Sequence, residues 1–149
     1  MDQMEKPCGV RRRLIAIVIV AACINVDAAS TSDPLTGLPV YPGVSTPSPL
    51  PKAIFCGKQM EKDVYIVMGK RVDVVTAWYA RHLPGHRRYH FSADGRSQDT
   101  FFSRDGTQEI TVTGSKAGPE VYSISYGRFQ SALTTLEMAS FNQPKKGCN

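Results

Sequence analysis

Two Asp-Gly dipeptides, at 94–95 and 105–106, constrain the fold of this chain more than any other feature of its sequence. Each stands between runs of β-prone residues, and both residues of such a pair tolerate the positive φ angles of a tight hairpin turn. We therefore expect residues 87–92, 97–103 and 107–113 to form three consecutive antiparallel strands.

A fourth strand is expected at residues 120–127, after the turn that Gly118-Pro119 predicts. Apolar residues alternate with serines along it from Tyr122 to Tyr126. Alternation of this kind is typical of a sheet with one covered face and one face in water.

Helical spacing of apolar residues appears twice. From Val72 to Leu83 it predicts an amphipathic helix that Pro84-Gly85 ends, and a short strand at 63–68 precedes that helix. A second helix is expected at 129–141, where apolar residues recur at the same spacing: Phe129, Leu133, Leu136 and Phe141.

The order strand, helix, meander, helix predicts an α+β fold. We expect a four- to five-stranded antiparallel sheet with both helices packed on one face. The folded domain is assigned to residues 52–142, followed by a tail at 143–149.

The first residues have the layout of an export signal. Arg11-Arg12-Arg13 precedes an unbroken apolar run at 14–22, and small residues follow. The run is about half of the roughly 20 residues that a membrane-spanning helix needs, so we expect a cleaved signal at 1–22 or, alternatively, at 1–28.

The two cleavage sites have different consequences. Cleavage after Val26-Asp27-Ala28 would release a soluble periplasmic or secreted protein. The segment Val20-Ala21-Ala22-Cys23 instead resembles a bacterial lipobox, in which Cys23 becomes lipidated. We favour lipidation, because residues 23–51 are rich in Ser, Thr, Pro and Gly and are expected to form a flexible tether behind the anchor.

The expected location is the periplasmic face of the cell envelope. An aspartate after the lipidated cysteine resembles a signal for retention in the inner membrane, and Ile24 at that position favours the outer membrane. The partners expected are a membrane, through the lipid, and an envelope protein or a cell-wall polymer.

Four cysteines are present, at 8, 23, 56 and 148. Cys8 leaves with the signal and Cys23 is removed or lipidated, which leaves two in an oxidising compartment. A Cys56–Cys148 disulfide is therefore expected, with a reactive thiol at Cys56 as the alternative.

The segment Leu38-Pro39-Val40-Tyr41-Pro42-Gly43, followed by a strand and a helix with Trp78-Tyr79, resembles a group of small exported bacterial proteins and lipoproteins. That group has a Leu/Val-Pro-x-Tyr-Pro-Gly opening motif and an aromatic-Tyr pair on the first helix. The resemblance covers residues 38–124 and implies an envelope address. It implies no catalytic residue, because no activity is assigned to the group.

The formal net charge of +5 favours anionic surfaces without identifying nucleic acid, and no nucleic-acid-binding motif is present. One basic cluster offers a candidate site for an anionic envelope ligand. The alternative is a solvated turn whose cations follow the end of a helix. The cluster comprises Arg81, His82, His86, Arg87 and Arg88.

No catalytic, cofactor or metal site is assigned from the sequence. It contains no nucleophile elbow, P-loop or dinucleotide motif. His82, His86 and His90 recur every four residues, but Pro84 breaks the helix that would align them. We expect a non-enzymatic interaction domain, with a hydrolase as the least favoured alternative.

Overall fold

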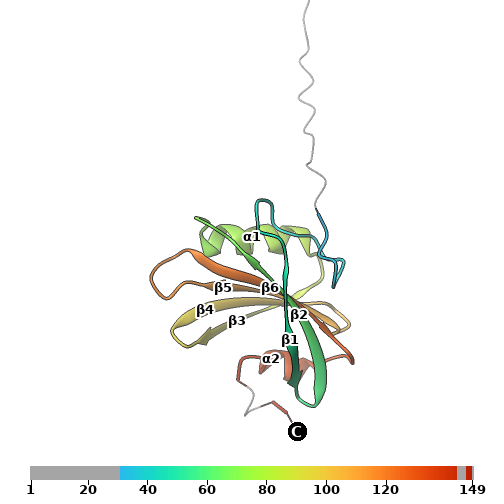
Figure 1. Ribbon diagram of the computed structural model, residues 1–149. Coiled ribbons are helices and arrows are strands. Elements are labelled where there is room, and N and C mark those ends of the chain that lie inside the picture. Colours follow the sequence, from blue (N-terminus) through green and yellow to red (C-terminus); the bar gives the residue numbers. More distant parts are fainter. Residues whose placement is uncertain (1–30, 144–146, 149) are drawn as a thin grey trace, which may run out of the picture.

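The computed structural model describes residues 31–143 and 147–148. It contains six strands and two helices, in the order shown in Figure 1. The elements are β1 (Ser48–Phe55), β2 (Lys58–Ile66), α1 (Val72–His82), β3 (Arg87–Ala93), β4 (Arg96–Phe102), β5 (Gln108–Gly114), β6 (Val121–Phe129) and α2 (Thr135–Ala139). Neither described helix is long and apolar enough to cross a membrane.

The strands form one antiparallel sheet in the order β1-β2-β6-β5-β4-β3. An antiparallel sheet with helices is confirmed, and its main part is the expected meander, β3 to β6. The sheet has six strands instead of four or five, because the sequence analysis did not identify β1.

The turn at Asp94-Gly95 is confirmed as a two-residue hairpin. Both residues have positive φ, at 52° and 73°, and Ala93 pairs with Arg96 across the turn. The turn at 105–106 reverses the chain differently. Only Gly106 has positive φ there, and the Asp105 carboxylate accepts hydrogen bonds from the Thr107 backbone N–H (3.0 Å) and the Ser103 hydroxyl (2.6 Å).

Strand β1 occupies residues that the sequence analysis divided between a tether and the domain. It contains Pro49 and Pro51, which cannot donate to a ladder, and it lies at the edge of the sheet, where prolines are tolerated. A two-residue turn at Cys56-Gly57 joins it to β2, with φ of 49° and 72°. Some of the prolines and serines that suggested a tether therefore lie in an edge strand.

The predicted flexible tether at 23–51 is wrong for its described part, residues 31–51. Asp33, Val40 and Tyr41 are buried, so the folded domain begins well before residue 52. The Asp33 carboxylate accepts hydrogen bonds from the Tyr65 hydroxyl (2.7 Å) and from the backbone and hydroxyl of Thr36. From its composition this segment was expected to stay flexible, because ordering it costs entropy. A long-range hydrogen bond such as that between Tyr65 and Asp33 offsets part of this cost.

Two tyrosine hydroxyls form a second set of hydrogen bonds to the N-terminal segment. Tyr126 donates to the Pro39 carbonyl (2.9 Å) and is bonded to the Tyr79 hydroxyl, which accepts from the Tyr41 backbone N–H (3.2 Å). Burial raises the pKa of both Tyr79 and Tyr126 above its usual value, so both phenols stay protonated. The opening motif and the Trp78-Tyr79 pair thus lie in contact, with the Tyr41 and Trp78 rings 5.4 Å apart.

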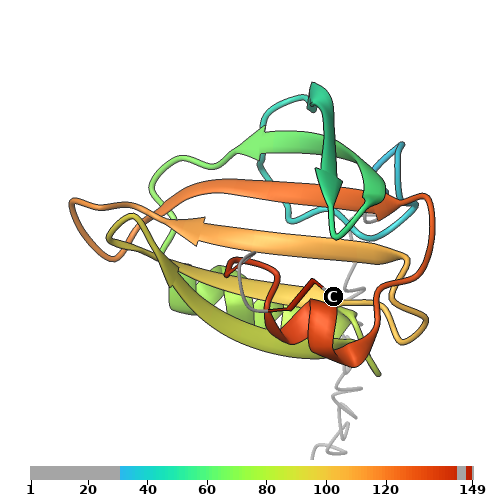
Figure 2. The same ribbon diagram turned by 90° about the horizontal axis from the view of Figure 1, so that it is seen from below.

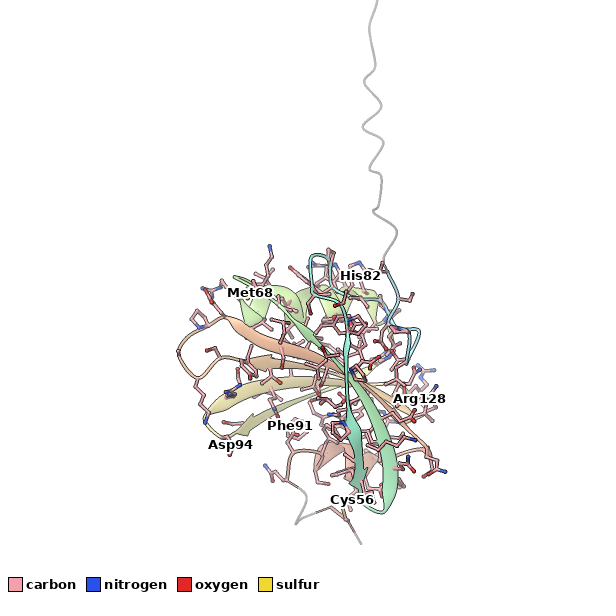
Figure 3. All side chains as sticks on the ribbon, viewed as in Figure 1. Cys56, Met68, His82, Phe91, Asp94 and Arg128 are labelled. Carbon is pink, nitrogen blue, oxygen red and sulfur yellow. A yellow bond between two sulfur atoms is a disulfide. The ribbon has the colours of Figure 1, made fainter. Side chains whose placement is uncertain are left out.

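The two helices lie on opposite faces of the sheet, so the expected packing on one face is wrong (Figures 1 and 2). We call the face that α1 covers the α1 face. Its buried cluster includes Tyr65, Val75, Tyr79, Ile110, Val112, Ile124 and Tyr126. Figure 3 shows Met68 and His82 on this side of the molecule and Cys56 at the opposite end.

The opposite, α2 face has its own apolar cluster, and the expected helix at 129–141 is wrong in its bounds. Phe129 ends β6, Leu133 lies in a loop, and only Thr135–Ala139 is helical. Leu136 is 57% exposed, whereas Phe129, Leu133 and Phe141 are buried together with Phe102 and Met138. The spacing identified three core residues, Phe129, Leu133 and Phe141, but none of them lies in α2.

A buried ion pair lies beside this cluster. Lys62 contacts the Glu109 carboxylate at 2.9 Å, Glu109 is fully buried, and the Thr111 hydroxyl donates to it at 2.7 Å. Gly127 makes room for the pair, because a Cβ there would lie 2.6 Å from Glu109 Oε1. Such a pair is tolerated only where hydrogen bonds compensate for lost hydration.

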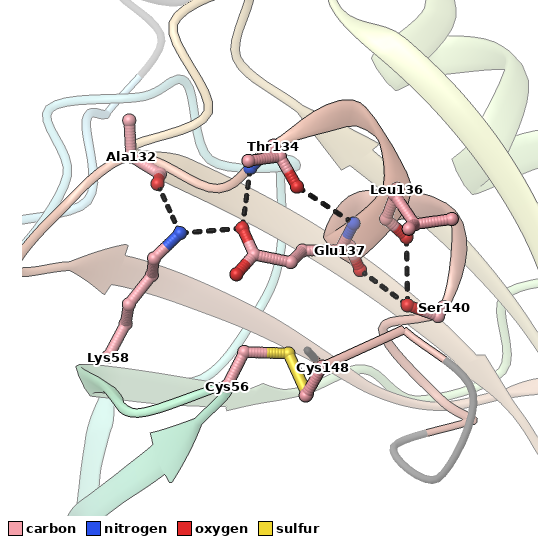
Figure 4. The surroundings of a disulfide bond; sticks show 8 residues. All are labelled: Cys56, Lys58, Ala132, Thr134, Leu136, Glu137, Ser140 and Cys148. Atoms are coloured by element: carbon pink, nitrogen blue, oxygen red, sulfur yellow. Dashed lines mark hydrogen bonds and ion pairs between the residues drawn. A yellow bond between two sulfur atoms is a disulfide. The ribbon is translucent and has the colours of Figure 1, made fainter.

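Helix α2 is stabilised at its N-terminus by side-chain hydrogen bonds, and a disulfide fixes the segment that follows it (Figure 4). Thr134 and Glu137 form a capping box, and Lys58 donates to Glu137 and to the Ala132 carbonyl (2.7 Å). The expected Cys56–Cys148 disulfide is confirmed, with the two Cα atoms 4.9 Å apart. It connects the β1–β2 turn to the chain end beyond α2.

Loss of the disulfide should destabilise the domain strongly. It joins residues 92 apart, and closing a loop of that size is worth about 4–5 kcal/mol in the chain-entropy model. We expect Cys148→Ala, which leaves the positive-φ backbone of Cys56 unaltered, to lower the melting temperature by about 15 °C or more in calorimetry. Reductant should lower it comparably in the wild type and leave the variant unchanged. Equal melting temperatures would contradict a stabilising role.

The bond between Asp33 and Tyr65 should be measurable in a double-mutant cycle. We expect Asp33→Asn and Tyr65→Phe each to lower the free energy of unfolding, with a coupling of about 1.5–3 kcal/mol because the acceptor is a carboxylate. Chemical denaturation of the four proteins measures it. Additive effects would show that the bond does not hold the N-terminal segment.

Asp63, which lies near the charge of Asp33, offers a separate test of stability that depends on pH. Burial, and then the nearby charge of Asp33, raise the pKa of Asp63, so its ionised form opposes folding. Asp63→Asn should therefore stabilise the protein at neutral pH. The gain should disappear as the pH falls below about 4, where the wild-type carboxyl is protonated in both folded and unfolded states.

Candidate functional site

The five residues of the predicted basic cluster do not form one surface. Successive residues of a strand point to opposite faces, so Arg87 and Arg88 at the start of β3 diverge. Arg87 donates to the Thr135 hydroxyl of α2 (2.7 Å), whereas Arg88 lies on the α1 face.

The remaining members of the cluster have local contacts. His82 stacks on Trp78 with the ring centroids 3.9 Å apart, and its Nδ1 lies 2.8 Å from the Trp78 carbonyl oxygen. His86 is partly buried, which lowers its pKa and favours its neutral form. Arg81 is exposed on the last turn of α1. Only Arg88 among the five lines the cleft described next.

A cleft of about 430 Å³ lies between α1 and the β3–β4 end of the sheet. The helix forms one wall and the two strands form the other, and Gly118 and Pro119 also line the cleft. The lining residues are Arg71, Val72, Asp73, Thr76, Ala77, Arg88, His90, Ser97, Asp99, Gly118 and Pro119.

Asp99 is the central charged residue of the cleft. Its side chain is only 6% exposed, and its Oδ1 atom accepts from Arg88 Nε (3.0 Å) and Arg88 Nη2 (2.9 Å). His90 Nδ1 lies 3.3 Å from the same oxygen. The Arg88 guanidinium also lies over the Phe101 ring, 5.8 Å from its centroid. Asp99 thus fixes the direction in which both basic side chains point.

The hairpin register explains this arrangement. In a two-residue hairpin centred on Asp94-Gly95, His90 stands opposite Asp99, and Arg88 stands opposite Phe101 on the same face. That register follows from the turn alone, so the sequence contained the signal for the Asp99 site. The sequence analysis did not use that register and assigned no role to Asp99.

The helix wall adds a buried hydroxyl and a second ion pair. Thr76 is 2% exposed, and its hydroxyl has no hydrogen-bond partner among the described residues. At the rim, Arg71 Nε and Nη2 donate to the two oxygens of Asp73, at 3.0 and 3.2 Å. This pair is well exposed, so it contributes little to stability.

Neither metal coordination nor lipidation is supported by a site in the described part of the chain. Residues 31–143 and 147–148 contain no group of three or more His, Cys, Asp or Glu placed to hold a metal ion. Cys23 and both predicted cleavage sites lie outside the described residues. No protein-family model, no curated protein and no solved structure matches the chain.

Removing the charge of Asp99 should cost measurable stability. We expect Asp99→Asn to lower the free energy of unfolding by about 1–2 kcal/mol, because a nearly buried oxygen then loses charge-assisted hydrogen bonds. Asp73→Asn is the control, since its well-exposed pair with Arg71 should contribute little to the free energy of unfolding. Equal effects in urea denaturation would show that burial does not distinguish the two pairs.

Proposed function

We propose that this chain is an exported, non-enzymatic protein of the bacterial cell envelope, held at a membrane by a lipid on Cys23, whose domain binds an envelope component. The observation that carries the proposal is the Cys56–Cys148 disulfide. Structural disulfides persist in oxidising compartments such as the periplasm and are rare in the cytosol. A domain closed by this bond fits a chain with an export signal at its start.

Because the folded domain begins near residue 31, the segment that would join it to a lipid on Cys23 is short. Only residues 24–30 separate Cys23 from Thr31, the first described residue. Even a fully extended chain of that length spans at most about 30 Å. A lipid on Cys23 would therefore hold the domain close to the bilayer, within reach of envelope polymers near the membrane.

The cleft beside α1 supports a binding role. Ligand sites are typically concave, of about 300–1,000 Å³, with a few convergent polar groups. The cleft has such a volume, and Arg88, His90 and Asp99 converge in it. We place the interaction surface of the domain there.

The mass of the mature N-terminus tests the anchor. We expect protein purified from the envelope to begin at Cys23 and to carry a diacylglyceryl group, and Cys23→Ser to release the domain from the membrane fraction. Cys8→Ser is the matched control, since Cys8 lies ahead of both predicted cleavage sites and its replacement should change neither result. A soluble product that begins at Ala29 would contradict the anchor, and an uncleaved cytosolic chain with free thiols would contradict export.

A further inference from the structure

We infer that the cleft between α1 and β3–β4 binds an uncharged, hydroxyl-rich ligand, a short segment of an envelope glycan. The inference deepens the binding role proposed above and rests on it. It depends on three observations: the balance of charge in the cleft, the polar atoms left without partners, and the apolar part of its wall.

The charges of the cleft cancel in pairs. Arg88 is bonded to Asp99 on the sheet, and Arg71 is bonded to Asp73 on the helix. An anionic ligand would have to compete with Asp99 for Arg88, and a cationic ligand would have to compete with Arg88 for Asp99. The pairing therefore favours a ligand without net charge.

Both donors and acceptors nevertheless remain available. Arg88 and His90 both bond to Oδ1 of Asp99. Within the described residues, no hydrogen bond reaches Oδ2 of Asp99. His90 is well exposed, with its second ring nitrogen left over. A hydroxyl group both donates and accepts, so adjacent sugar hydroxyls match such alternating partners.

The wall of the cleft also has an apolar part, to which Val72, Ala77 and Pro119 contribute. These side chains can pack against the C–H face of a sugar ring while its hydroxyls bond to Asp99 Oδ2 and to His90.

The test is a titration of the ¹⁵N-labelled mature chain, with Cys23→Ser to remove the lipid site, using chitotetraose, maltotetraose and mannotetraose as neutral probes. We expect at least one to shift the amides of Thr76, His90 and Asp99, with an affinity that changes less than about twofold between 50 and 300 mM salt, because no net charge is neutralised. Tripolyphosphate is the anionic comparison.

Two variants separate binding from folding. His90→Ala removes a well-exposed cleft side chain, so it should keep the melting temperature while it weakens glycan binding about tenfold. Thr111→Val is the control on the α2 face: the Thr111 hydroxyl is bonded to Thr100 (2.8 Å) and Glu109 (2.7 Å), so this variant should be less stable but bind unchanged.

Three results would overturn the inference. They are the absence of shifts with all three neutral probes, shifts confined to residues outside the cleft, and salt-dependent binding of tripolyphosphate at Arg88 that exceeds glycan binding. The titration does not involve the lipid. Its failure would therefore leave a lipidated Cys23 standing, and a soluble mature protein would not affect the titration.

Discussion

The central constraint on this fold is that its single sheet is apolar on both faces, so each face needs its own cover. A six-stranded sheet with one face in water would need only α1. Here Phe102 and Phe129 point away from α1 into a second core, and the last part of the chain covers them. The N-terminal segment of the domain helps to cover the α1 face and is fixed by the buried carboxylate of Asp33. The C-terminal segment covers the α2 face and is fixed by the Cys56–Cys148 bond.

The features that sequence predicted correctly are local in origin. Asp94-Gly95 specifies a hairpin from two residues, and α1 follows from apolar spacing that Pro84-Gly85 ends. The disulfide is the exception, since it joins residues 92 apart. It was predicted by elimination, because only Cys56 and Cys148 remain once Cys8 and Cys23 are assigned to the predicted signal and lipidation site.

The errors concern segments whose structure depends on distant partners. Residues 31–51 have the composition of a linker, and they are ordered because Asp33 and Pro39 bond to tyrosines of β2 and β6. Likewise Phe129 and Leu133 have helical spacing but enter the core from a strand end and a loop. The apolar spacing identified three buried residues and one exposed residue, Leu136, while tertiary contacts decide which backbone carries the buried ones.

The α1 face is covered differently at its two sides, and this explains where the cleft lies. The segment at 31–44 bonds to Tyr65 on β2 and Tyr126 on β6, so it closes the half of the α1 face nearest β1. Over β3 and β4 the cover within the described residues is α1, and the wall of the cleft there carries Arg88, His90 and Asp99. Charged groups so close to a core are tolerated because Asp99 pairs with Arg88. The pairing that stabilises this half of the sheet also leaves the cleft without net charge, so fold stability and the ligand preference that we propose depend on the same residues.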